Sequence, residues 1–91
     1  MTDLTILRNA ITLVKQAVEE DRNKNYPEAL RLYKLSLDFF VVAFRCEKSE
    51  KSKQLIKEKI IEYLHRAEKI KEFIETEHDL RYNLKQYYVC F

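Results

Sequence analysis

The feature that most restricts the fold of this 91-residue chain is the complete absence of glycine. Tight β-hairpin turns need residues at positive φ, which glycine adopts at the lowest energetic cost. Phosphate-binding loops and the sharp nucleophile turn of hydrolases use glycine for the same backbone freedom. With a single proline as well, the chain favours long helices joined by short polar loops. It disfavours hairpins, nucleotide loops and that kind of catalytic site.

The length allows one compact domain, and 46% apolar with 35% charged residues is typical of a globular chain rather than a disordered one. The net charge is only +2 with both signs interspersed, which argues against a dedicated nucleic-acid domain. Cys46 and Cys90 are interpreted as free thiols of a reducing compartment. His65 and His78 lack ligand spacing, so we expect no metal. The longest apolar run, 39–44, is too short for a membrane span, and we expect no targeting segment.

Residues 4–18 follow a helical rhythm, because apolar side chains recur at steps of three and four. Two adjacent stripes give the broad apolar face of a helix that packs against two neighbours. The polar run 19–25 is expected to end this helix. The stripes are Leu4, Leu7, Ile11, Val14 and Val18, and Ile6, Ala10, Leu13 and Ala17.

A second helix is predicted from the segment Asn-Tyr-Pro-Glu at 25–28 to about Arg45. Asn25 suits an N-cap, Pro27 is tolerated in a first turn, and Glu28 stands where a capping box needs it. The C-terminal half of this segment is apolar nearly all round. It should therefore be the central, most buried helix.

A third helix is predicted from about Glu50 to at least Ile74, with Ser49 as its N-cap. Helical spacing continues through 76–91, which extends this helix or forms a short fourth one. The fold prediction is an all-α, antiparallel three-helix bundle at 1–75 with a C-terminal tail at 76–91. A long coiled coil is the alternative, but the capped breaks near 24 and 48 disfavour it. The expected core stripe of the third helix is Ile56, Ile60, Tyr63, Ala67, Ile70 and Ile74.

Three motifs together resemble a MIT (microtubule-interacting and trafficking) domain. They are A-x3-V-x2-A-x2-E-D over 10–21, NYPEALRLY over 25–33 and YLHRAEKIK over 63–71. The resemblance covers about residues 4–75. Within the family it is greatest to the N-terminal domain of an ESCRT-III-disassembling AAA ATPase. The loop before the third helix is slightly shorter here, and the ending YYVCF differs from the polar linker expected there. We therefore expect an excised domain or a free-standing MIT protein.

The resemblance implies that the C-terminal tails of ESCRT-III subunits bind this chain. Such tails lie as a helix between the second and third helices, or extended between the first and third. Ile61, Leu64 and Glu68 form a line flanking the core stripe of the third helix. By the resemblance, Leu64 receives a leucine of a ligand helix and Glu68 pairs with its arginine. Lys59 would pair with an acidic residue of the same ligand.

The resemblance also makes Phe39 the opposing wall on the second helix, and it makes Val14 a marker of the groove for extended tails. From periodicity alone another interpretation stays open. Ile61 and Leu64 would then be ordinary core, with Lys59 and Glu68 as solvated surface. Val14 belongs equally to the main stripe of its own helix.

The tail resembles a ligand of the helical type, with Glu77, Leu80, Leu84 and Tyr87 at the motif's spacing and Asn83 in place of its arginine. We hypothesise that it occupies the groove between the second and third helices of its own or a neighbouring chain. The alternative is a frayed amphipathic extension of the third helix.

The sequence thus predicts a non-catalytic, cytoplasmic interaction domain, monomeric in isolation, that recruits its parent protein to ESCRT-III on endosomal membranes. The parent is expected to be an AAA ATPase. We expect no cofactor, no nucleic acid and no membrane insertion. The alternative is a free-standing MIT or TPR-like adaptor in another trafficking or chaperone pathway. The TPR version is weakened by the lack of glycine and of any repeat of about 34 residues.

Overall fold

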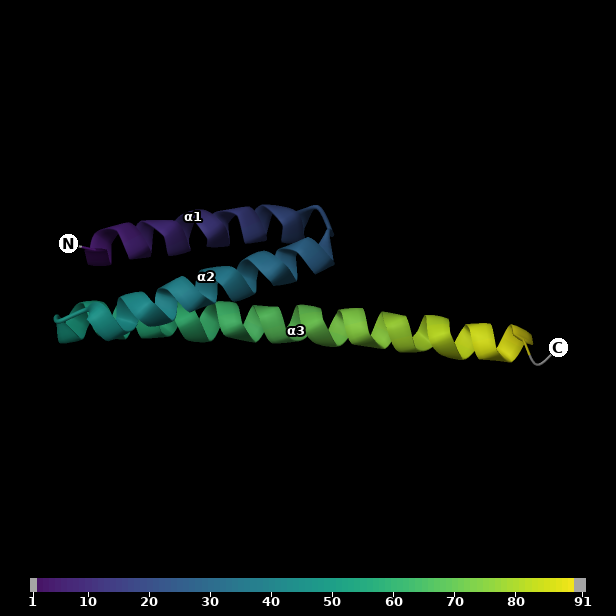
Figure 1. Cartoon of the computed structure of the whole chain (residues 1–91). Coiled ribbons are helices and arrows are strands. Elements are labelled where there is room, and N and C mark those ends of the chain that lie inside the picture. Colours follow the sequence, from purple (N-terminus) through teal and green to yellow (C-terminus); the bar gives the residue numbers. More distant parts are fainter. Residues whose placement is uncertain (1, 90–91) are drawn as a thin grey trace.

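Three long helices follow one another in the computed structural model, which describes the backbone of residues 2–89 and the side chains of residues 5–77. They are α1 (Thr2–Arg22), α2 (Tyr26–Cys46) and α3 (Glu50–Val89). Successive helices run in opposite directions, and α2 packs against both α1 and α3 (Figure 1). Residues 2–89 contain no strand. The prediction of an all-α three-helix bundle is confirmed.

The end of α1 lies further along the chain than its apolar stripes. The polar residues from Glu19 to Arg22 are helical, because Glu and Arg are good helix formers and polarity alone does not end a helix. The helix ends where Lys24 adopts φ 63°, the left-handed conformation that commonly follows a helix C-terminus. The helix therefore continues past the apolar stripes, which stop at Val18, and ends inside the polar run 19–25, as expected.

The two predicted N-caps have different outcomes. The side chain of Asn25 makes no capping bond to α2; its amide instead donates to Glu20 Oε2 at 2.7 Å. The expected capping box is absent, because the backbone N–H of Asn25 donates to the carbonyl of Glu20 at 2.9 Å. The Glu28 carboxylate accepts two hydrogen bonds from Arg31 instead. Pro27 does lie in the first turn. At the start of α3, the backbone N–H of Ser52 donates to Ser49 Oγ at 3.3 Å, which confirms that cap.

Small residues let α1 and α2 pack closely. Ala10 and Ala17 of α1 and Ala29 and Ser36 of α2 have no exposed surface, and helix axes approach most closely where interface side chains are small. The hydroxyl of buried Ser36 donates to the carbonyl of Tyr33 at 2.8 Å, so it carries no unsatisfied group. The larger core side chains are Val14, Leu32, Tyr33, Leu37, Phe40, Ile56 and Ile70.

The predicted roles of α2 and α3 are confirmed. Buried residues are spread along most of the central helix α2. They are Ala29, Leu32, Tyr33, Ser36, Leu37, Phe40 and Ala43. In the predicted stripe of α3, Ile56, Ala67 and Ile70 are buried. The other three members of that stripe, Ile60, Tyr63 and Ile74, are partly buried against the same core.

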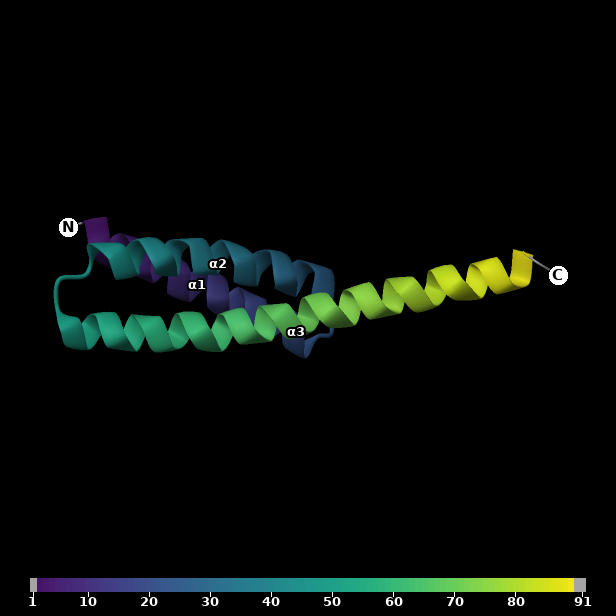
Figure 2. The ribbon, with the colours of Figure 1, turned by 90° about the horizontal axis from the view of Figure 1, so that it is seen from below.

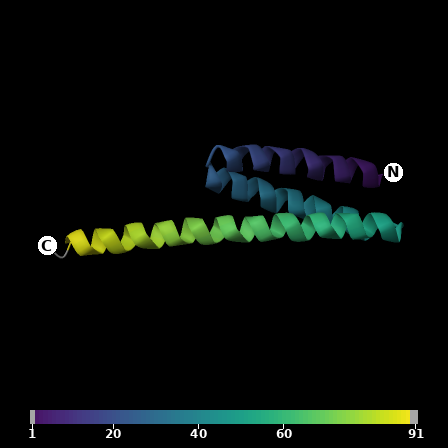
Figure 3. The same cartoon turned by 180° about the vertical axis from the view of Figure 1, so that it is seen from behind.

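The last part of α3 runs on beyond the level of the α1–α2 connection, without a break, to Val89 (Figures 1, 2 and 3). The three-helix region and this projection together are 63 Å long. The hypothesis that the tail acts as a ligand depends on side chains after residue 77, which lie outside the described residues. Within residues 2–89, none of the three helices is both long enough and apolar enough to cross a membrane.

Candidate functional site

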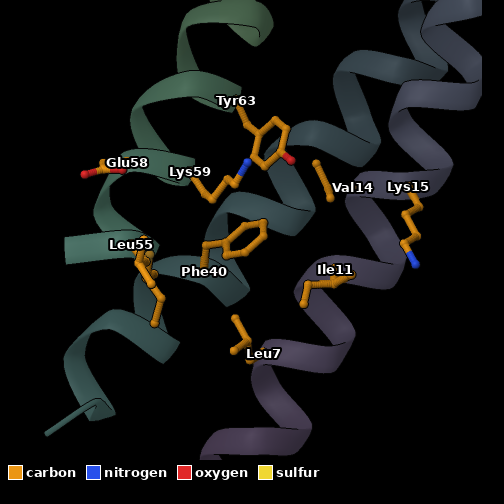
Figure 4. A pocket seen from close by; sticks show the side chains of 10 residues that line it. Leu7, Ile11, Val14, Lys15, Phe40, Leu55, Glu58, Lys59 and Tyr63 are labelled. Carbon is orange, nitrogen blue, oxygen red and sulfur yellow. The ribbon is translucent and has the colours of Figure 1, made fainter. Parts of the chain in front are cut away.

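An open apolar groove lies between α1 and α3, and α2 forms its floor. Its volume is about 480 Å³. Phe40 of α2 lies between the two walls, while Val14 of α1 and Tyr63 of α3 line the groove from opposite sides (Figure 4). The backbones of α1 and α3 do not come into direct packing contact, and this separation leaves the groove open. The remaining apolar lining consists of Leu7, Ile11, Leu55 and Ile56.

Apolar side chains that line the groove are unusually open to solvent. Leu55 is 57% exposed and Ile11 is 39% exposed. Leu55 lies on the α3 side of the groove and Ile11 on the α1 side (Figure 4). A concave surface with exposed aliphatic side chains is the kind of feature that binds an apolar segment of a partner.

Two lysines give the groove a positive rim. Lys15 of α1 and Lys59 of α3 both line it, and Glu58 is the acidic residue beside them. The ammonium of Lys59 lies 3.5 Å from Glu62 Oε1 and 6.0 Å from the ring centroid of Tyr63. Because both partners of the Lys59–Glu62 pair are mostly exposed, the pair contributes little stability. Lys59 is therefore available to a ligand carboxylate.

One carboxylate joins all three helices near the α1–α2 connection. Asp21 of α1 accepts two hydrogen bonds of 2.7 Å from the guanidinium of Arg66 of α3. It also accepts one of 3.1 Å from the hydroxyl of Tyr33 of α2. Among the side chains of residues 5–77, this is the ion pair that links α1 to α3. Asp21, Arg66 and Tyr33 are together called the clamp; it lies at the end of α1, and Arg66 contributes to it from the middle of α3.

The clamp shifts the pKa values of its members. The hydrogen bonds from Arg66 are the largest influence on Asp21 and lower the pKa of its carboxyl group. Burial, followed by the negative charge of Asp21, raises the pKa of the Tyr33 hydroxyl to about 12. The pKa of Arg66 is raised, chiefly by its hydrogen bonds to Asp21. At neutral pH the clamp therefore consists of a carboxylate, a guanidinium and a neutral phenol.

The clamp could not be predicted from the helical periodicity of the sequence. Asp21 was part of a polar run that was expected to end α1, and Tyr33 lies twelve positions further on, in another helix. Arg66 lies 45 positions from Asp21. Periodicity reports which face of one helix is apolar. It carries no information about which polar residues of different helices meet.

The predicted site residues of α3 are divided between two flanks. Ile61 is 57% exposed and Leu64 is 46% exposed, and Glu68 is exposed as well. None of these three lines the groove, whereas Lys59 does. Leu64 lies five positions after Lys59, a step that corresponds to a rotation of about 140° around the helix axis. The structure groups Ile61, Leu64 and Glu68 on one flank and places Lys59 on the other.

On α2, the aromatic side chain on the Leu64 flank is Phe44, not Phe39. Lys53 lies over the ring of Phe44, with Nζ 5.1 Å from its centroid, and Lys53 is eleven residues before Leu64, almost the same angular position. Phe39 is partly buried and lies seven residues after Leu32, on the same helical face. Leu32 lines a depression together with residues of α1, so this face is turned to α1.

Val14 is buried, 5% exposed, and also lines the groove between α1 and α3. Its side chain therefore belongs to the core and also reaches the groove surface, and its role in binding stays a prediction. Across the described side chains, His, Cys, Asp and Glu residues do not gather in a group of three that could ligate a metal ion.

Comparison with known proteins gives one family and several relatives. The model of the MIT (microtubule interacting and transport) domain matches residues 7–72. Vacuolar protein sorting-associated protein 4 of Dictyostelium discoideum is 52% identical over 75 residues, 82% of this chain. Protein SUPPRESSOR OF K(+) TRANSPORT GROWTH DEFECT 1 of Arabidopsis thaliana is 42% identical over 72% of the chain. The human serine/threonine-protein kinase ULK3 is 40% identical over 77% of it. The chain spans 17%, 15% and 15% of the length of these relatives.

Proposed function

Because this chain belongs to the MIT domain family, we propose that it binds the C-terminal tails of ESCRT-III subunits and so recruits its parent protein to ESCRT-III polymers. The observation that supports this most directly is the open groove of about 480 Å³ between α1 and α3. A domain whose third interface is left open by its own packing has room for a short chain from a partner.

The groove favours an extended, mainly apolar segment with an acidic residue. Leu7, Ile11 and Leu55 offer aliphatic contacts on both walls. Lys15 and Lys59 stand at the rim, where a carboxylate of the ligand would gain a charge-assisted hydrogen bond. From Leu7 to Val14 the wall of α1 is about 10 Å long, at about 1.5 Å per residue. That length accommodates about three residues of extended chain.

The opposite flank of α3 is proposed as the surface for helical tails. Ile61 and Leu64 present aliphatic side chains there with about half of their surface exposed. Glu68 lies one turn beyond Leu64 and is free to pair with an arginine of the ligand. On α2 we now propose Phe44 as the facing aromatic residue in place of Phe39, because Phe44 contacts Lys53 on this flank.

We further propose that the parent protein is an AAA ATPase that disassembles ESCRT-III in endosomal sorting. This is supported by the similarity to vacuolar protein sorting-associated protein 4. A parent of another kind, such as a kinase, is the alternative that the similarity to ULK3 keeps open. In either case the domain acts from the cytoplasm and reaches the endosomal membrane through its protein partner. A single short tail in a small groove should bind weakly, in roughly the micromolar range.

Two surface variants separate the two proposed sites. Leu55→Asp places a charge in the lining of the groove, and Leu64→Asp places one on the opposite flank of α3. Both residues are about half exposed, so the fold should tolerate the changes. Fluorescence anisotropy would measure binding of labelled ESCRT-III tail peptides of the extended and the helical type.

The expected result is a crossed pattern. Leu55→Asp should abolish binding of the extended peptide and leave the helical peptide unaffected, and Leu64→Asp should do the reverse. Each variant thus serves as the control for the other, and circular dichroism would verify the helix content. The proposal fails if the unmodified domain binds neither peptide class at about 100 µM, a concentration that detects interactions of about −5.5 kcal/mol.

A further inference from the structure

A third apolar surface lies on α2, away from both proposed binding sites. It consists of Leu35, Phe39, Val42 and Cys46 and is called the outer stripe below. Leu35 is 37% and Val42 39% exposed, while Phe39 and Cys46 are partly exposed. None of the four lines the groove between α1 and α3. The stripe lies on the side of α2 that carries Leu32, beside α1 and away from α3.

The spacing of the outer stripe is that of a helix–helix seam. Its members are separated by four, three and four residues, the alternation by which apolar side chains of paired helices interlock. In heptad terms Phe39 and Cys46 occupy one seam position, and Leu35 and Val42 occupy the other. An exposed seam on an otherwise packed helix is suited to a second helix.

The charges beside the outer stripe recur every seven residues as Arg31, Asp38 and Arg45. Arg31 is engaged by Glu28, with a separation of 2.6 Å. Asp38 and Arg45 are exposed, and among the side chains of residues 5–77 neither takes part in an ion pair. One acidic and one basic side chain are thus left without a partner on the same edge.

We propose that the outer stripe binds the outer stripe of a second copy of this chain, with the two α2 helices antiparallel. A twofold axis between residues 40 and 41 brings Phe39 to Val42 of the second copy, and Leu35 to its Cys46. The same register brings Asp38 near Arg45 of the second copy, and symmetry forms this pair twice. All exposed members of the stripe are then covered.

The charge pattern selects this occupant and this direction. In a parallel pair the edge with Asp38 and Arg45 would face the other edge of the second helix, which carries Ser36 and Ala43, so neither charge would gain a partner. The antiparallel pair turns the same residues into two attractions, so the edge is complementary to itself. In this register Cys46 faces Leu35 of the second copy and not its Cys46, so the proposed dimer does not depend on a disulfide bond.

The interface is small, since it uses one face of one helix from each copy, and small interfaces belong to weak, concentration-dependent complexes. The sequence led us to expect a monomer, and the dimer replaces that expectation only at high concentration. High local concentration arises wherever parent proteins gather on one polymer. The outer stripe is separate from the tail-binding surfaces, so this proposal stands independently of them.

Sedimentation equilibrium in the presence of a reducing agent tests the proposal. The chain would be measured from about 10 µM to about 1 mM, a range suited to weak contacts. The variants are Asp38→Arg, Arg45→Asp and the double exchange. Lys57→Glu, an exposed charge reversal on α3, is the matched control.

The wild-type chain should shift toward a dimer over this range. Each single reversal converts two attractive pairs into repulsive ones and should weaken association about tenfold. The double exchange should restore it, and Lys57→Glu should leave it unchanged. A wild-type chain that stays monomeric throughout overturns the proposal. So does a double exchange that associates no better than the single variants, because only the proposed register pairs these two positions.

Discussion

The clamp at Asp21 permits a quantitative test of how the third helix is held. Asp21→Asn keeps the size of the side chain and an oxygen that accepts from the Tyr33 hydroxyl. It removes the negative charge that faces the two N–H groups of Arg66, each 2.7 Å away. The substitution also replaces one acceptor oxygen by an amide N–H donor, so it removes at least one of the two hydrogen bonds from Arg66 while it leaves packing nearly unchanged.

The expected loss lies between two limits. Hydrogen bonds to charged groups contribute about 1.5–3 kcal/mol when well shielded, whereas exposed ion pairs contribute about 0–1 kcal/mol. The Asp21 side chain is only 14% exposed, but that of Arg66 is 45% exposed, so solvent screens one side of the pair. We expect Asp21→Asn to lower the free energy of unfolding by about 1–2 kcal/mol.

Urea denaturation at neutral pH and thermal melting would measure this loss. For a domain of this size the melting temperature should fall by about 4–8 °C per kcal/mol. Glu62→Gln is the matched control, since it neutralises the mostly exposed Lys59–Glu62 pair and should change stability by less than about 0.5 kcal/mol. If Asp21→Asn lowers the free energy of unfolding no more than Glu62→Gln does, the clamp contributes no more than an exposed ion pair and the expectation is refuted.

The pH dependence of the free energy of unfolding provides an independent test of the clamp. The folded-state pKa of Asp21 lies below its ordinary value of 3.8, so the unfolded chain takes up the proton first as the pH falls. The contribution of the carboxylate is therefore fully present above the unfolded-state pKa, and it is lost as pH falls through the folded-state pKa. The stability difference between wild type and Asp21→Asn should be constant from pH 7 to about pH 5 and shrink below about pH 4.

Three further predictions concern single residues. The pKa of Tyr33 is raised to about 12, so its hydroxyl should stay mostly protonated at pH 11. Difference absorbance at 295 nm should detect its ionisation only when the domain unfolds. If Tyr33 ionises at the same pH as the exposed tyrosines, its buried position in the clamp is wrong. Phe40→Ala should lower the free energy of unfolding, measured by urea denaturation, by about 3–5 kcal/mol. The reason is that Phe40 is 3% exposed and its ring stacks on that of Tyr63. A loss below about 1 kcal/mol would place Phe40 outside the core. Lys24→Gly should raise the free energy of unfolding by up to about 1 kcal/mol, because glycine holds φ 63° without strain; a loss of stability would show that the Lys24 side chain matters.

Helix number, order and core stripes could be predicted because they depend on local periodicity. The stripe from Ile56 to Ile74 needs only the helical repeat to be recognised. The end of α2 and the start of α3 at Glu50 were also placed closely, but the geometry that ends α1 and begins α2 could not be predicted, because it depends on the backbone and hydrogen bonds of single residues. Lys24 in the left-handed region ends α1, and no pattern marks lysine for that conformation. Asn25 has the right chemistry for a cap, but its amide is drawn to Glu20 instead.

The candidate site shows a similar division. The flanking line of Ile61, Leu64 and Glu68 follows from angular position on one helix, and the exposure of these side chains agrees with it. Their role in binding stays a prediction. The separation of Lys59 from Leu64 and the contact of Phe44 with Lys53 depend on how helices are rotated against each other. That rotation is set by tertiary packing, which a single sequence does not express.

The incomplete contact between α1 and α3 also has a thermodynamic consequence. Two of the three possible helix interfaces are filled by the chain's own side chains, and the third is tied at the Asp21–Arg66 clamp. A tail that enters the groove would complete the core, so its binding energy would add to the stability of the fold. A ligand at a hundred times its dissociation constant would raise the free energy of unfolding by about 2.7 kcal/mol. The melting temperature of the domain would then report whether the groove is occupied, and the bundle would resist local opening most while a tail is bound.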